Sequence, residues 1–143
     1  MIQNAEISFL KVSAAGNRFL ISEGVPPADI DLVKKIQIWC HPETGFGVDG
    51  CLFLEQQRSS YVLHFYNSDG ATAEMCGNAA CSAVYFLHLR GAKTQGLKFE
   101  TLSGVVDISE VTDSFPINFA ISLQMPKFLD AAVNIKVDGK DVK

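Results

Sequence analysis

The stretch FYNSDGATAEMCGN, residues 65–78, combines a turn signal with the start of a helix. Asp69-Gly70 lies between two short strand-like runs, which predicts a hairpin turn. From Asn78 the chain is rich in helix formers as far as Leu89, so we expect a helix to begin there. The chain therefore brings Cys76 to the N-terminal end of a helix.

A cysteine at this position is suited to chemistry. Unpaired backbone N–H groups and the positive end of the helix dipole stabilise a thiolate, which can act as a base or a nucleophile. The same N–H groups can hold a carboxylate. Cys76 therefore indicates proton removal next to a carboxylate. The other interpretation, which the residues alone leave open, is a small buried hydrophobic side chain, the usual fate of a free cysteine.

Length and composition favour a single soluble domain. The chain has 143 residues, 48% of them hydrophobic, which is enough for one core. The net charge is −4 and there is no basic run, which argues against nucleic acid as a partner. No signal peptide pattern opens the sequence, and its longest apolar run, residues 79–89, is far shorter than the about 20 residues of a membrane span. We expect a cytoplasmic protein with no membrane partner.

The four cysteines, at positions 40, 51, 76 and 81, are interpreted as free thiols. No export signal accompanies them, and the chain is larger than a typical disulfide scaffold. No Cys-x-x-Cys pair is present, so we expect no metal site. Cys81 lies within the apolar helix and is expected in the core.

The pattern of apolar residues predicts an α+β fold. Apolar residues surround the helix at 78–89, which indicates a buried, central helix. A second helix follows Pro26-Pro27 and ends at His41-Pro42. We expect a mixed or antiparallel sheet wrapped around the central helix, with the second helix outside. The strand-like runs are 5–13, 19–21, 52–54, 61–66, 97–101, 105–111 and 118–124.

Several short motifs have both a structural and a functional interpretation. Residues 45–50 match the dinucleotide pattern G-x-G-x-x-G, but a helix precedes them and a strand follows, the reverse of a nucleotide site. They are expected to form a glycine-rich connection. Asn17 and Asn67 lie at turn edges, and Asn78 is placed as a helix N-cap; each role is common for asparagine without any function.

Three motifs together resemble the N-terminal half of the diaminopimelate epimerase family. Gly16-Asn17-Arg18-Phe19 resembles the family's opening G-N-D-F, and residues 45–50 with Leu52 resemble its glycine-rich G-x-G-x-D-[GQ]. Residues 66–78 resemble F-N-x-D-G-S…C-G-N-G and carry the most specific match, because turn, cysteine and anion cradle recur in order and spacing.

The resemblance implies an isomerase of lysine and peptidoglycan precursor synthesis, which interconverts LL- and meso-diaminopimelate. In that family two cysteines face opposite sides of the substrate α-carbon; one thiolate removes the α-proton and the other, as a thiol, returns a proton. No pyridoxal phosphate or metal is used. Cys76 matches one of these cysteines, and Asn17, Asn67, Gly77 and Asn78 match substrate-contacting positions.

Two departures from the family pattern leave the exact amino acid open. Cys81 stands where the family commonly has arginine, and Arg18 replaces its usual acidic residue. The related proline and hydroxyproline racemases follow Cys-Gly with histidine, so Asn78 favours the epimerase branch. The alternatives are a racemase of another amino acid, or a non-catalytic ligand-binding or thiol-redox domain with the same fold.

The resemblance also implies a missing C-terminal half. The family has two similar halves, the second carrying the other catalytic cysteine, and no cysteine follows Cys81. We expect residues 1–126 to form the N-terminal epimerase-like domain and 127–143 to begin the connection to the second. An exposed apolar face would also favour a homodimer.

Overall fold

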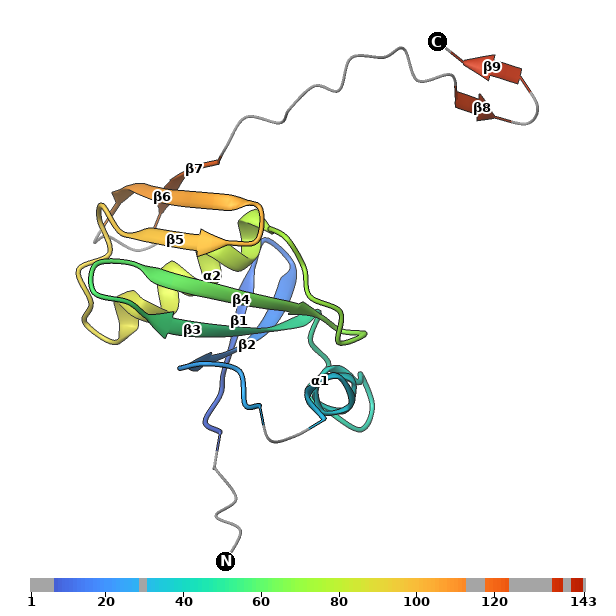
Figure 1. Cartoon of the computed structure of the whole chain (residues 1–143), viewed down its shortest axis with the longest axis horizontal. Helices are drawn as coiled ribbons and strands as arrows, with labels where there is room; N and C mark the ends of the chain where they lie inside the picture. Colours follow the sequence, from blue (N-terminus) through green and yellow to red (C-terminus); the bar gives the residue numbers. More distant parts are fainter. Residues whose placement is uncertain (1–6, 29–30, 113–117, 124–134, 138–139, 143) are drawn as a thin grey trace, which may run out of the picture.

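The computed structural model describes residues 7–28, 31–112, 118–123, 135–137 and 140–142 (Figure 1). Its helices are α1 (Leu32–Cys40) and α2 (Gly77–Leu89). Its strands are β1 (Leu10–Ala14), β2 (Asn17–Glu23), β3 (Gly50–Gln56), β4 (Tyr61–Asn67), β5 (Lys98–Thr101), β6 (Gly104–Val111), β7 (Phe119–Ser122), β8 (Ile135–Val137) and β9 (Lys140–Val142). The expected α+β fold is confirmed: β1 to β7 form one mixed sheet in chain order, with β2–β3 and β4–β5 parallel and the other neighbours antiparallel.

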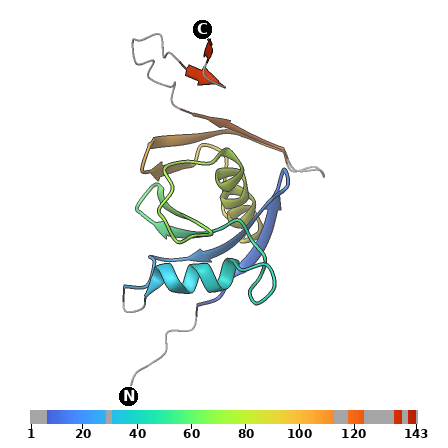
Figure 2. The same cartoon turned by 90° about the vertical axis from the view of Figure 1, so that its right-hand side faces the viewer.

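Helix α2 lies inside the curve of this sheet (Figure 2). Seven of its thirteen residues are buried, among them Val84, Phe86 and Leu87, which confirms the central helix that the sequence predicted. They pack against inward-facing strand residues such as Phe19 and Phe99. Each fully buried side chain of this size contributes about 1.5–3 kcal/mol, so the helix and the sheet stabilise each other.

Helix α1 lies on the opposite face of the sheet (Figure 2). Asp31 caps it by accepting a hydrogen bond from the backbone N–H of Lys34 at 3.2 Å, so the helix starts slightly later than its apolar pattern suggested. Its buried residues, Ile36 and Cys40, join a second apolar cluster with outward-facing strand residues such as Phe53. The sheet is therefore covered on both faces where β2 and β3 lie between the two helices.

The first hairpin fixes the beginning of β2. Ala14 pairs with Asn17, and the two residues between them, Ala15 and Gly16, have φ of 47° and 93°. Positive φ at both central positions is the geometry of the tight turns that match strand twist. β1 begins at Leu10, later than the expected start at residue 5, and residues 1–6 lie outside the described part of the chain.

The turn expected at Asp69-Gly70 is confirmed, but the strand expected after it is reduced to one bridge, between Tyr66 and Thr72. The backbone N–H of Gly70 donates to the carbonyl of Asn67 at 2.9 Å. Because only this bridge continues the pairing, the chain leaves the sheet between Thr72 and α2. This departure carries Cys76 to the end of the helix.

In the tail, β8 and β9 pair antiparallel as a short two-stranded sheet. The domain boundary expected at residues 126 and 127 lies outside the described residues, so it stays a prediction. Within the described ranges, neither helix has the length and apolar character needed to cross a membrane.

Candidate active site

Cys76 is the N-cap residue of α2. Its backbone is extended, with φ −145° and ψ 122°, and its carbonyl accepts the first helical hydrogen bond, from the N–H of Ala80 at 3.0 Å. Its side chain makes no capping hydrogen bond, so the sulfur is not committed to holding the helix end. The thiol is half-buried at a helix N-terminus, where the sequence placed it.

Asn78 is not the N-cap that the structural interpretation assigned to it. It is the second residue of α2, and its Nδ2 donates to Oδ1 of Asn17 at 2.7 Å. The helix starts earlier than expected because Cys76 itself has the extended backbone of a cap. The contact joins two residues 61 positions apart, and both are predicted substrate-contacting residues.

Asn17 and Asn67 lie at the same end of the sheet. Asn17 begins β2, and β3 runs parallel to β2, starting with Gly50 opposite Phe19. β4 is antiparallel to β3 and ends with Asn67 opposite Gly50. The register thus brings both asparagines to the same end of the sheet, and Asn67 is exposed there. The hydrogen bond between Asn17 and Asn78 connects the N-terminus of α2 to this end of the sheet.

Gly77 has no packing reason to be glycine among the described residues. A Cβ at this position would meet only Cδ1 of Ile121, at 3.9 Å, which is an ordinary van der Waals contact. A glycine that packing does not require is consistent with a ligand approaching the backbone of the first helical turn. The surroundings of Gly77 therefore favour a role in substrate contact over a role in packing.

The glycine-rich segment before β3 holds the start of β2 in place. The Asp49 carboxylate accepts a hydrogen bond from the backbone N–H of Arg18 at 2.7 Å, and the Asp49 N–H donates to the Arg18 carbonyl, also at 2.7 Å. This pair of hydrogen bonds fixes the residue next to Asn17. The sequence did not identify Asp49 as a site residue; its place in the glycine-rich motif was the available signal.

Cys81 differs from its expected core position because it is partly exposed. Burial raises the pKa of its thiol, and the nearby Cys76 raises it further. A raised pKa keeps the thiol protonated to higher pH and slows its reaction with electrophiles. Cys40 and Cys51 are buried, with exposed fractions of 4% and 0%.

We expect Cys76 to react first with iodoacetamide near neutral pH, because its thiol is half-buried and makes no capping hydrogen bond. The raised pKa of Cys81 keeps that thiol protonated, and Cys40 and Cys51 are buried. Mass spectrometry of peptides from the folded protein, sampled over a pH series, gives the order of labelling. Faster labelling of Cys81, Cys40 or Cys51 would contradict this assignment. Labelling in urea provides the control, since all four thiols should then react alike.

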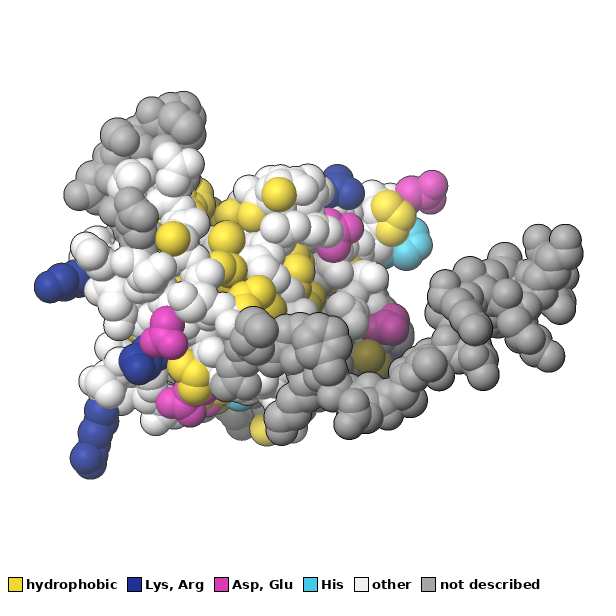
Figure 3. Space-filling view, turned by 90° about the horizontal axis from the view of Figure 1, so that it is seen from above, with side chains coloured by type: hydrophobic (Ala, Val, Ile, Leu, Met, Phe, Trp, Pro, Cys, Tyr) yellow, Lys and Arg dark blue, Asp and Glu magenta, His cyan; other side chains and the backbone are white. Residues whose placement is uncertain are grey.

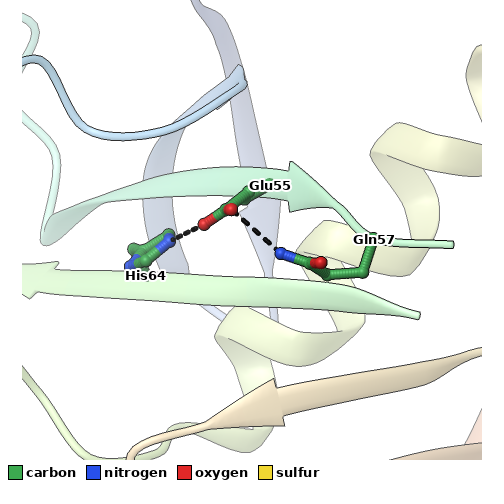
Figure 4. Close-up of polar contacts among 3 residues, drawn as sticks. All are labelled: Glu55, Gln57 and His64. Carbon is green, nitrogen blue, oxygen red and sulfur yellow. Dashed lines mark hydrogen bonds and ion pairs between the residues drawn. The ribbon is translucent and has the colours of Figure 1, made fainter.

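A separate polar cluster lies on the outer face of β3 and β4 (Figure 4). His64 Nε2 and Glu55 Oε2 are 2.9 Å apart, and Gln57 Nε2 donates to Glu55 Oε1 at 2.9 Å. His64 also lines a pocket of about 260 Å³ between β4 and the turn after β5. None of the predicted site residues lines this pocket. We therefore place the candidate site at Cys76, beside the contact between Asn17 and Asn78.

Within the described residues, no group of three histidine, cysteine, aspartate or glutamate side chains is arranged to hold a metal ion. The donors that the candidate site offers are instead neutral: the amides of Asn17 and Asn78 and the N–H groups that begin α2. Such donors suit a carboxylate.

Comparison with known proteins identifies the family. The family model described as diaminopimelate epimerase matches residues 9–121. The diaminopimelate epimerase of a Nitratiruptor species is 33% identical over 135 residues, covering 94% of this chain and 51% of the relative. That of Carboxydothermus hydrogenoformans is 34% identical over 108 residues, covering 70% of this chain and 38% of the relative.

Solved structures agree on the fold. A phenazine biosynthesis protein of the PhzF family from Enterococcus faecalis superposes with a TM-score of 0.57 at 16% identity, over 73% of this chain and 40% of that one. At this identity the likeness concerns the fold alone. The chain spans about half the length of the Nitratiruptor relative, so its motifs correspond to one part of a longer enzyme.

Proposed function

The chain belongs to the diaminopimelate epimerase family, and on this premise we propose that Cys76 is a proton-transfer residue of an amino-acid epimerase that needs no cofactor. The observation that carries the proposal is the N-cap position of Cys76, with its thiol free of any capping bond. The proposed reaction interconverts LL- and meso-diaminopimelate. This substrate comes from the relatives, which are named for it.

In the proposed mechanism, the Cys76 thiolate takes the α-proton of the substrate or, as a thiol, returns one. An α-proton of an amino acid is very weakly acidic, so the negative charge that develops on the carboxylate must meet fixed hydrogen-bond donors. The N–H groups at the start of α2 supply such donors. The amides of Asn17 and Asn78, joined at 2.7 Å, and the exposed Asn67 supply side-chain donors at the same end of the sheet.

Inversion also needs a proton donor on the opposite face of the α-carbon. We propose that a second half, similar in fold, brings the other thiol to Cys76 and covers the site. Two observations support this arrangement. The chain covers 51% of the Nitratiruptor relative, and hydrophobic side chains gather near the centre of the face that carries β6 and β7 (Figure 3). Pairing of two copies of the chain is the alternative arrangement.

The test of the proposal is whether residues 1–143 alone invert the α-carbon. We expect the purified chain to fold but to leave LL-diaminopimelate unchanged, because one thiol serves only one face. Chiral analysis after incubation in deuterium oxide measures both inversion and α-proton exchange. Robust inversion by the chain, free of any longer enzyme, would overturn the two-half arrangement.

Replacing Asn78 with aspartate separates its structural role from its function. Asn17 can turn its amide to donate to the new carboxylate, and a negative charge near a helix N-terminus is favourable, so the melting temperature should stay near wild type. The added charge should repel the substrate carboxylate and weaken binding by about tenfold or more. Calorimetry on the complete enzyme measures the affinity.

Asn78→Ala is the matched control, since it removes the hydrogen bond to Asn17 without adding charge. It should cost about 1 kcal/mol of stability. If Asn78→Asp bound substrate as well as wild type, Asn78 would be a structural residue only.

A further inference from the structure

The proposed mechanism does not use Cys40 and Cys51, which lie where α1 packs against the sheet. Sγ of Cys40 and Sγ of Cys51 are 3.8 Å apart. Both side chains are buried, with exposed fractions of 4% and 0%. They belong to different elements, because Cys40 is the last residue of α1 and Cys51 the second residue of β3. The contact therefore spans the interface between the outer helix and the sheet.

The two thiols have different acid–base character. The hydrogen bond between the two thiols lowers the pKa of Cys40, an effect larger than the opposing effect of its burial. The same hydrogen bond raises the pKa of Cys51, and burial raises it further. Cys40 also lies at the end of α1 and is the less buried of the two, so we place the first attack on this thiol. The raised pKa keeps Cys51 protonated, and Cys51 is the thiol that closes the disulfide in the second step.

We propose that Cys40 and Cys51 form a reversible disulfide when the protein reacts with a low-molecular-weight disulfide such as glutathione disulfide. This bond would link α1 covalently to β3. This inference does not depend on the proposed function, because neither cysteine belongs to the candidate active site. The sulfurs must approach from 3.8 Å to about 2 Å. Cys40 lies at a helix end, where the last turn frays more readily than the middle, which gives the reagent access.

The exchange is balanced in two steps. The Cys40 thiolate attacks one sulfur of glutathione disulfide, forming a mixed disulfide and releasing one glutathione thiolate. The Cys51 thiolate then attacks the Cys40 sulfur and releases the second glutathione. The protons of the two protein thiols end on the two glutathione molecules, so the protein loses two electrons and glutathione disulfide gains them.

The crosslink would act on the turn that precedes the candidate site. Gln37 of α1 donates through Nε2 to the carbonyl of Asp69 at 2.8 Å, and Val33 lies against Gly70. Helix α1 therefore supports the turn between β4 and α2. A disulfide that holds α1 on the sheet would hold this support as well, so oxidation should stiffen the region rather than loosen it.

The experiment equilibrates the folded protein in glutathione buffers of increasing oxidised fraction and maps the disulfides by mass spectrometry. We expect a Cys40–Cys51 crosslink as the main intramolecular product, reversed by dithiothreitol. We also expect the melting temperature of the crosslinked protein to rise by about 5 °C or more, because the bond restricts the unfolded chain.

Matched variants separate this pair from the other thiols. Cys40→Ala and Cys51→Ala should abolish the rise in melting temperature, whereas Cys81→Ala should keep it. Mapping of the wild-type protein decides the question even if a core variant fails to fold. A Cys76–Cys81 disulfide as the main product, mixed glutathione disulfides without the Cys40–Cys51 bond, or a crosslink that lowers the melting temperature would each overturn the proposal.

Discussion

Replacing Cys76 with serine should reduce amino-acid inversion by the complete enzyme about 10³-fold or more, because a serine hydroxyl is a far weaker base than a thiolate near neutral pH. The fold should not suffer. Cys76 makes no capping bond, and serine is among the preferred N-cap residues, so the variant should be as stable as wild type or more stable by up to about 1 kcal/mol. Loss of turnover with unchanged or higher stability is a combination that a purely structural cysteine would not produce.

Deuterium exchange at the α-carbon, followed by chiral chromatography, measures the turnover. Cys81→Ser is the matched control, since it changes a partly exposed thiol of the same helix that we do not place in the mechanism. We expect it to retain most of the activity. Near-native inversion by Cys76→Ser would exclude Cys76 as the proton-transfer residue.

Replacing Gly70 with alanine should destabilise the protein by about 3 kcal/mol. Gly70 is buried and has φ +85°, a conformation that alanine adopts only with strain. An added Cβ would also lie 2.9 Å from both Cα and the carbonyl oxygen of Val33, which are backbone atoms of α1 and cannot move alone. Urea unfolding, with midpoint and slope compared to wild type, measures the loss.

Gly96→Ala isolates the backbone contribution. Gly96 has φ +79°, close to that of Gly70, but a Cβ there would meet nothing within 4 Å. It should cost about 1 kcal/mol. The difference between the two variants is the steric cost of pushing α1 away from the turn. Equal losses would show that α1 does not support the turn through this contact.

The sequence determined the features that depend on neighbouring residues. Apolar residues on every side of the segment ending at Leu89 predicted a buried helix, and its thirteen residues include seven that are buried. The Asp69-Gly70 pair predicted the turn, since glycine adopts positive φ without strain. These signals act over a few residues, so no knowledge of the rest of the chain was needed to place Cys76 at a helix end.

Local signals were less reliable at the element boundaries. Asparagine is a favoured cap, which pointed to Asn78, yet Cys76 takes the cap position without any side-chain bond. The strand expected after Gly70 is only a bridge. In both places tertiary contacts override the local preference. The side chain of Asn78 forms a hydrogen bond with Asn17 instead of capping the helix. After the bridge at Thr72 the chain leaves the sheet to enter α2.

Tertiary structure alone decided which distant residues meet. The hydrogen bond from Asn78 to Asn17 spans 61 positions, and the contact between Cys40 and Cys51 joins a helix to a strand on the face opposite the central helix. Both depend on strand order and register, with β3 parallel to β2 and antiparallel to β4. The spacing of apolar residues along a helix or strand shows which of its faces is buried. Which other element packs on that face is decided only when the whole sheet forms around α2.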